Sequence, residues 1–144
     1  MSKLYFAYGS NMSFAQMKSR CGNLRFVKRG HIIDHKFVYD GISTKRRGAV
    51  ANTVPHKGEE VWGGIFEINE LCERILDGHE GVSKRVYYKD NVRVYDDDGN
   101  QYICLIYIGS GPRPIGKPSE GYRSIILKGA SDCKLPTVYV SKYL

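Results

Sequence analysis

A β-hairpin is the structure that this sequence specifies most clearly. Residues 84–95 and 101–108 each alternate polar and apolar side chains, and the turn sequence Asp-Asp-Asp-Gly-Asn separates them. An Asp-Gly pair between alternating segments is typical of a tight hairpin turn, whose backbone twist matches that of the flanking strands. We therefore expect at least one antiparallel strand pair.

Four further segments have the composition of strands, because they are rich in β-branched and aromatic residues. They are residues 3–8, 24–29, 31–39 and 61–68. The basic segment 40–48 between them is expected to be a loop. Residues 109–118 hold three of the five prolines, so a second irregular loop is expected there.

Three short helices are expected, each preceded by a residue that caps helix N-termini well. Ser13 precedes a helix that Gly22 ends, Asn69 precedes one that ends near Gly78, and Ser119 precedes one that runs to about residue 128. The apolar faces expected for the first two helices consist of Phe14, Met17 and Cys21, and of Leu71, Ile75 and Leu76. Residues 135–144 fit either a strand or a short helix.

The whole chain of 144 residues fits one domain, residues 1–144, with a hydrophobic core of its own. About six strands and two or three short helices predict an α+β fold. Such elements pack as a small mixed β-barrel, or a curled sheet, with the helices outside.

Composition also predicts the cellular location of the protein, the state of its cysteines and the charge of its ligands. No apolar segment is long enough to cross a membrane, and the N-terminus lacks the pattern of a signal peptide, so a cytoplasmic protein is expected. The four cysteines form no Cys-x-x-Cys pair and are expected to be reduced and mostly buried. The net charge of +7 favours anionic ligands of some kind.

Two motifs indicate a site for ligand binding or catalysis. The segment Tyr-Phe-Ala-Tyr-Gly-Ser-Asn-Met, residues 5–12, leads from the first expected strand into a turn. Such a turn presents backbone N–H groups, and its glycine lets a ligand approach closely. The second motif is Leu-Asp-Gly-His-Glu-Gly-Val, residues 76–82, which places Glu80 just beyond a helix end.

These two motifs, in this order, resemble the γ-glutamylcyclotransferase family, which includes AIG2-like proteins. The resemblance extends over nearly the whole chain and implies a small mixed β-barrel with flanking helices. It also implies that Glu80 is the catalytic acid and base. The substrate-binding residues that it implies are Tyr5, Phe6, Ala7, Tyr8, Gly9, Ser10, Asn11, Tyr87, Tyr107 and Tyr122.

The reaction of such a family needs no nucleophile from the protein. In a γ-glutamyl compound the α-amino group can attack the γ-carbonyl and close the ring of 5-oxoproline, which expels the attached amine. One carboxyl group can move the protons of both steps. We therefore expect an enzyme without metal or organic cofactor, acting on a small-molecule γ-glutamyl amino acid or amine, as a monomer or homodimer.

Several alternatives stay open at this point. The enzyme could instead remove a γ-glutamyl group from an amine or a natural product, or the chain could be a non-catalytic γ-glutamyl-binding module. A third alternative is a basic nucleic-acid-binding barrel. We do not expect a nucleic-acid partner, because the basic run at residues 45–47 is short and fits a loop that steers anionic substrates. His31 and His35 lie about 13 Å apart in an extended strand, too far to share a metal. Asp96, Asp97 and Asp98 fit a solvated hairpin turn better than a calcium loop.

Overall fold

The computed structural model describes residues 2–22 and 24–144. These residues form the strands β1 (Ser2–Ala7), β2 (Arg25–Ser43), β3 (Gly48–Asn69), β4 (Tyr87–Tyr95) and β5 (Gln101–Gly109). The helices are α1 (Phe14–Cys21), α2 (Glu70–His79), α3 (Glu120–Asp132) and α4 (Thr137–Tyr143), with two 3-10 turns, η1 (Ser10–Met12) and η2 (Val82–Lys84).

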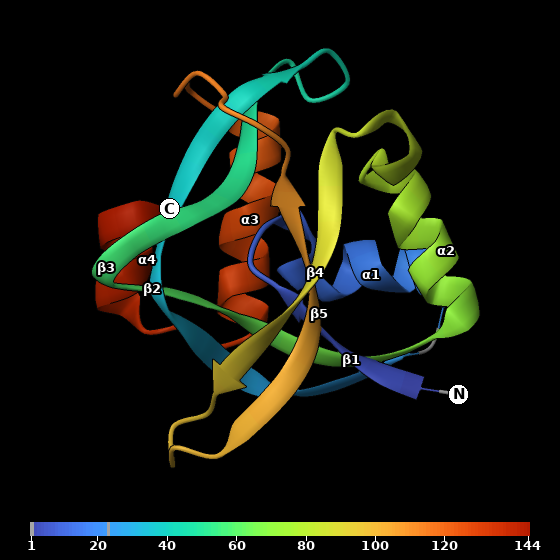
Figure 1. Cartoon of the computed structure of the whole chain (residues 1–144), viewed down its shortest axis with the longest axis vertical. Coiled ribbons are helices and arrows are strands. Elements are labelled where there is room, and N and C mark those ends of the chain that lie inside the picture. Colours follow the sequence, from blue (N-terminus) through green and yellow to red (C-terminus); the bar gives the residue numbers. More distant parts are fainter. Residues whose placement is uncertain (1, 23) are drawn as a thin grey trace.

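The strands close into a barrel in the order β1-β3-β2-β4-β5 (Figure 1). β1 and β5 are parallel where Tyr5 lies opposite Leu105, and the other neighbouring strands are antiparallel. The predicted α+β mixed barrel is therefore confirmed, and so is the hairpin formed by β4 and β5. The described residues form five strands instead of about six, and the ambiguous C-terminal segment forms α4.

The difference in strand number comes from β2, which joins two segments that were expected to be separate. A Cβ atom on Gly30 would lie 2.6 Å from a methyl carbon of Val94. Glycine is therefore needed at this position so that β4 can approach, and it does not end the strand. The loop expected at 40–48 shortens to a turn at 44–47, because β3 begins at Gly48 and pairs with β2 from there.

The predicted helix caps are confirmed in all three cases. The side-chain oxygens of Ser13, Asn69 and Ser119 accept hydrogen bonds from the backbone amides of the first helical turns. The buried face predicted for α2 is partly wrong, because Leu71 is 59% exposed while Cys72 is buried beside Leu76. The helix is rotated so that Cys72 faces α1.

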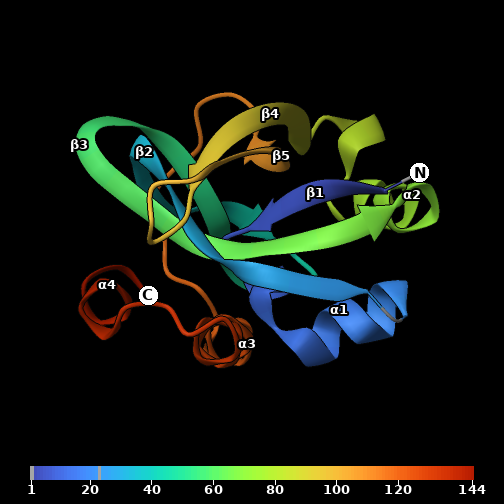
Figure 2. The same ribbon diagram turned by 90° about the horizontal axis from the view of Figure 1, so that it is seen from below.

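The helices and loops are distributed unevenly around the barrel. α1, α3 and α4 lie along one side of it, and α2 lies near the start of β1 (Figure 2). The turn 44–47, the loop after β5 and the segment after α2 gather at the upper end of the barrel in Figure 1. Hydrogen bonds from Gly41 to Pro114 and from Ser110 to Val86 join these segments. In the described part of the chain no helix is long and apolar enough to span a membrane.

Candidate active site

A cavity of about 320 Å³ opens at the end of the barrel where these segments meet. Its wall includes nine of the eleven predicted site residues, namely Tyr5, Tyr8, Gly9, Ser10, Asn11, Glu80, Tyr87, Tyr107 and Tyr122. The other two, Phe6 and Ala7, do not line it. Phe6 is fully buried in the core, and Ala7 is buried opposite Gly64 of β3.

Glu80 lies at the C-terminal end of α2, where its backbone amide bonds to the carbonyl of Leu76. The left-handed conformation of Gly81, with φ of 63°, then turns the chain away from the helix axis. No side chain or amide within residues 2–22 and 24–144 donates a hydrogen bond to its carboxyl group. That carboxyl group is therefore free to contact a ligand.

The surroundings of Glu80 favour its protonated form. Burial raises the pKa of Glu80 to about 7, although the positive charges of Arg20, Arg46 and Arg113 act in the opposite direction. A carboxyl group with a pKa near neutrality can both accept and donate a proton at physiological pH. This property fits a group that moves protons in both directions.

Three of the cavity tyrosines are fixed by hydrogen bonds within the protein. The hydroxyl groups of Tyr8, Tyr87 and Tyr107 donate to the carbonyl of Tyr107, the carbonyl of Ala51 and the carboxylate of Asp77, at 2.6, 2.6 and 2.7 Å. Since each hydroxyl group has only one hydrogen, these donors are already used. These three residues therefore shape the cavity wall.

Tyr5 and Tyr122 differ, because their hydroxyl groups accept hydrogen bonds. Tyr5 accepts from the side-chain amide of Asn11 at 3.0 Å, and Tyr122 accepts from the backbone amide of Ala51 at 2.9 Å. Burial raises the pKa of Tyr122 to about 12 and also raises that of Tyr5, so both groups keep their hydrogens at neutral pH. Both hydrogens are available for a ligand in the cavity.

The turn after β1 offers further donors. The backbone amides of Gly9, Ser10 and Asn11 bond to no acceptor in the part of the chain that the structure describes. A Cβ atom on residue 9 would lie 2.9 Å from that of Ala51, so glycine is required for the turn to pack against β3. The side chain of Gln16 holds the turn by donating to Ser10 Oγ and Asn11 Oδ1, at 2.8 and 2.9 Å.

Three arginines in the cavity wall were missed by the sequence analysis of the site. Arg20 comes from α1, Arg46 from the turn 44–47, and Arg113 from the loop after β5. Arg113 forms an ion pair of 3.2 Å with the buried carboxylate of Asp40. No spacing marks these residues in the sequence, and the basic run at 45–47 indicated only a positively charged loop.

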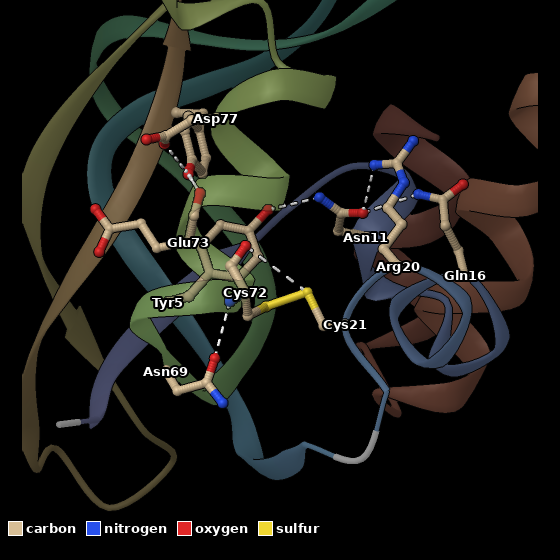
Figure 3. The surroundings of a disulfide bond; sticks show 10 residues. Tyr5, Asn11, Gln16, Arg20, Cys21, Asn69, Cys72, Glu73 and Asp77 are labelled. Carbon is tan, nitrogen blue, oxygen red and sulfur yellow. Dashed lines mark hydrogen bonds between the residues drawn. A yellow bond between two sulfur atoms is a disulfide. The ribbon is translucent and has the colours of Figure 1, made fainter.

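Two of the four cysteines form a disulfide, contrary to the prediction that all are reduced. Cys21 at the end of α1 and Cys72 in the first turn of α2 are bonded, with their Cα atoms 5.0 Å apart (Figure 3). Cys104 and Cys133 are free and buried, as predicted. The sequence did not indicate the pair, because 51 residues separate two cysteines that only the packing of α1 on α2 brings together.

The disulfide lies close to the residues that hold the turn. Figure 3 shows Asn11 between Tyr5 on one side and Arg20 and Gln16 on the other. Arg20, the neighbour of Cys21, donates to Asn11 Oδ1 at 2.9 Å. The disulfide thus joins the helix that supports the turn to the helix that Glu80 follows. Among residues 2–22 and 24–144, no group of three or more His, Cys, Asp or Glu is arranged to hold a metal ion.

Known proteins resemble this chain in both fold and sequence. The sequence model of the AIG2-like family matches residues 60–143. The human and mouse proteins named gamma-glutamylcyclotransferase are 30% and 29% identical to this chain, over 98% and 96% of it and 77% and 76% of their own lengths. A solved structure named gamma-glutamyl cyclotransferase superposes with a TM-score of 0.93 at 29% identity, covering 99% of this chain and 86% of that one.

The closed mixed barrel and its match to a cyclotransferase structure define a small enzyme of the cyclotransferase type. The extent of the sequence match identifies the family. The chain belongs to the AIG2-like family, among the gamma-glutamylcyclotransferases.

Proposed function

We propose that this enzyme converts a γ-glutamyl amino acid or γ-glutamyl amine to 5-oxoproline and releases the free amine. The observation that supports this most directly is the carboxyl group of Glu80, which has a pKa of about 7 and accepts no hydrogen bond from the residues that the structure describes. It shares its cavity with the free amides of Gly9, Ser10 and Asn11. A γ-glutamyl group needs both features, since it has an ammonium group that must lose protons and a carboxylate that needs donors.

In the proposed reaction, the α-nitrogen of the substrate attacks the γ-carbonyl carbon. The ring C–N bond forms, and the C–N bond to the leaving amine breaks. The α-nitrogen loses two protons overall and the leaving nitrogen gains two. Glu80 transfers them one at a time, accepting each from the α-nitrogen and donating it to the leaving amine. No protein nucleophile takes part.

The barrier to ring closure is mainly one of orientation. The glutamyl chain must fold so that its two ends meet, and holding it in this shape can contribute roughly 7 to 11 kcal/mol in favourable cases. The amides of the Tyr8-Gly9-Ser10 turn would hold the α-carboxylate. The hydroxyl groups of Tyr5 and Tyr122 are the free donors for the oxyanion that develops on the γ-carbonyl.

The test is an assay for 5-oxoproline with a panel of γ-glutamyl amino acids and amines. Glu80→Gln keeps the size of the side chain but cannot accept a proton, so turnover should fall by about 100-fold or more. Glu70→Gln is the matched control, because Glu70 is exposed at the other end of the same helix. Full activity of Glu80→Gln would exclude Glu80 as the group that moves protons.

Turnover of this substrate panel also distinguishes the alternative functions. An enzyme that deprotects γ-glutamylamines or natural products would turn over the amine members of the panel and leave the amino-acid members unchanged. A non-catalytic binding module would bind γ-glutamyl compounds and release no 5-oxoproline with any leaving group.

Further proposals concern the protein as a whole. We propose that residues 1–144 act as one domain, because the cavity takes residues from β1 at one end and α3 at the other. A cytoplasmic location, a monomeric or homodimeric state and the lack of a nucleic-acid partner stay predictions. The Cys21–Cys72 disulfide is unusual for a cytoplasmic protein, because disulfides are rare in reducing compartments.

A further inference from the structure

Two of the three cavity arginines have no acidic partner in the described part of the chain. The charge of Arg113 is compensated by Asp40, at 3.2 Å. Arg20 and Arg46 form no ion pair with any Asp or Glu of residues 2–22 and 24–144. Since Glu80 is the one acidic side chain in the described cavity wall, the cavity keeps a positive charge even when Glu80 is ionised.

Arg46 is held in place although its charge is unpaired. Its guanidinium carbon lies 5.1 Å from the centre of the Tyr122 ring, and one of its nitrogens donates to Gln16 Oε1 at 3.2 Å. Its backbone amide also bonds to Ser43 Oγ at 3.1 Å. A guanidinium group has five N–H donors, so most of them stay available in a fixed orientation.

The position of Arg46 distinguishes it from Arg20. Arg20 donates to Asn11 itself, so it belongs to the support of the turn that receives the glutamyl end, whereas Arg46 reaches that turn only through Gln16. Arg46 extends from the turn 44–47, beside Ile42, which is 83% exposed, and Thr44, which is also exposed. These exposed neighbours place the turn 44–47 at the rim of the cavity, and in the proposed function the leaving group would point to this rim.

We propose that Arg46 is a specificity-determining residue that binds a carboxylate on the leaving group. This inference rests on the proposed function. The three charges of a γ-glutamyl amino acid then each meet a partner: the ammonium group meets Glu80, the α-carboxylate meets the turn amides, and the carboxylate of the leaving amino acid meets Arg46. A γ-glutamylamine without that carboxylate leaves the Arg46 guanidinium unpaired, so the enzyme discriminates against it.

The proposal is tested with two substrates of equal size, γ-glutamyl-alanine and γ-glutamyl-alaninamide, which differ by one carboxylate. The measured quantity is the ratio of their kcat/KM values for 5-oxoproline formation. In Arg46→Met this ratio should fall about 10- to 100-fold, because a charge-assisted hydrogen bond is lost for one substrate alone. Arg46→Lys should recover part of the ratio, since it restores the charge without the planar fork.

Arg47→Met is the matched control, because Arg47 is the exposed neighbour of Arg46 and lies outside the cavity wall. It changes the net charge equally and should leave the ratio unchanged. A proportional loss for both substrates in Arg46→Met would overturn the proposal, because it would show that Arg46 contacts the shared glutamyl end or only supports the fold.

A failure of the proposed function is distinguishable from a failure of this inference. If the wild-type protein forms no 5-oxoproline, the proposed reaction is wrong. Titration calorimetry with the same two compounds then tests Arg46 without turnover. Tighter binding of γ-glutamyl-alanine that disappears in Arg46→Met supports the role of Arg46, and equal binding of both compounds contradicts it.

Discussion

At the scale of single residues, the chemistry of Glu80 depends on its surroundings more than on its identity. Its carboxyl group enters a cavity where burial outweighs three positive charges, and its pKa rises to about 7. A carboxyl group in this state destabilises the folded protein when it ionises. Glu80 thus lowers the stability of the folded enzyme when it ionises, and the same raised pKa suits it to the proposed reaction.

The raised pKa of Glu80 predicts how the free energy of unfolding depends on pH. The folded pKa of about 7 lies above the ordinary value of 4.5, so the folded state binds the proton more tightly than the unfolded chain. Stability should therefore fall as pH rises from about 4.5 to about 7 and stay level above that. The total loss is up to roughly 3 kcal/mol. Glu80→Gln should remove it, so urea unfolding should find the variant more stable than the wild type at pH 8 and similar to it at pH 4.

The exposed Glu70→Gln variant again provides the comparison, and its difference from the wild type should change little over this range. A stability difference between Glu80→Gln and the wild type that does not vary with pH would show that the Glu80 carboxyl group is solvated.

At the scale of elements, the Cys21–Cys72 disulfide joins two helices that hold the two halves of the site. α1 supports the turn through Gln16 and Arg20, and α2 ends at His79, directly before Glu80. Each helix is short, and a short helix is stabilised mainly by its packing. A covalent bond between α1 and α2 therefore strengthens a contact that few residues make.

Loss of this bond should lower the free energy of unfolding by about 2 to 5 kcal/mol, because the unfolded chain gains freedom when a loop of this length opens. The measurement is urea unfolding of the wild type and of Cys72→Ser, with and without dithiothreitol. The reductant should destabilise the wild type and leave Cys72→Ser unchanged. Thiol titration of the unfolded, unreduced wild type should find two thiols, Cys104 and Cys133. Four thiols and no effect of the reductant would contradict the disulfide.

At the scale of the whole molecule, the cavity combines residues from the start of the chain with residues from its last third. α3 provides Tyr122 to the cavity and packs on the turn after β1 through Gly129. A Cβ atom on residue 129 would lie 2.5 Å from the amide nitrogen of Ser13 and 2.6 Å from the carbonyl carbon of Met12. The backbones of two distant segments therefore come into direct contact.

Gly129→Ala should destabilise the protein by about 1 to 3 kcal/mol, because the added methyl group overpacks this contact. It should also weaken activity, since α3 must shift and take Tyr122 with it. Gly121→Ala is the matched control in the same helix, because a Cβ atom there meets nothing within 4 Å. It should stabilise the protein by up to about 1 kcal/mol. Thermal unfolding of both variants checks these signs, and equal effects would show that α3 does not pack closely on the turn.

Local sequence predicts those features that depend on residues near one another in the chain. The caps at Ser13, Asn69 and Ser119, the hairpin of β4 and β5, and the position of Glu80 past a helix end were all predicted correctly, because each depends on residues within a few positions of one another. Nine of the eleven predicted site residues line one cavity, since short motifs and the resemblance to the family indicated them. Phe6 and Ala7 were included with their neighbours, although they face the core.

Other features depend on contacts between segments far apart in the chain, and no local pattern marks such contacts. The approach of β4 to Gly30 makes one strand where two were expected. The packing of α1 on α2 pairs Cys21 with Cys72, and the closure of the barrel brings Arg20, Arg46 and Arg113 around Glu80. Local sequence thus specifies where the helices α1, α2 and α3 begin and where the hairpin turns. Burial and charge, which give Glu80 its pKa and leave Arg46 unpaired, arise only when distant segments exclude water together.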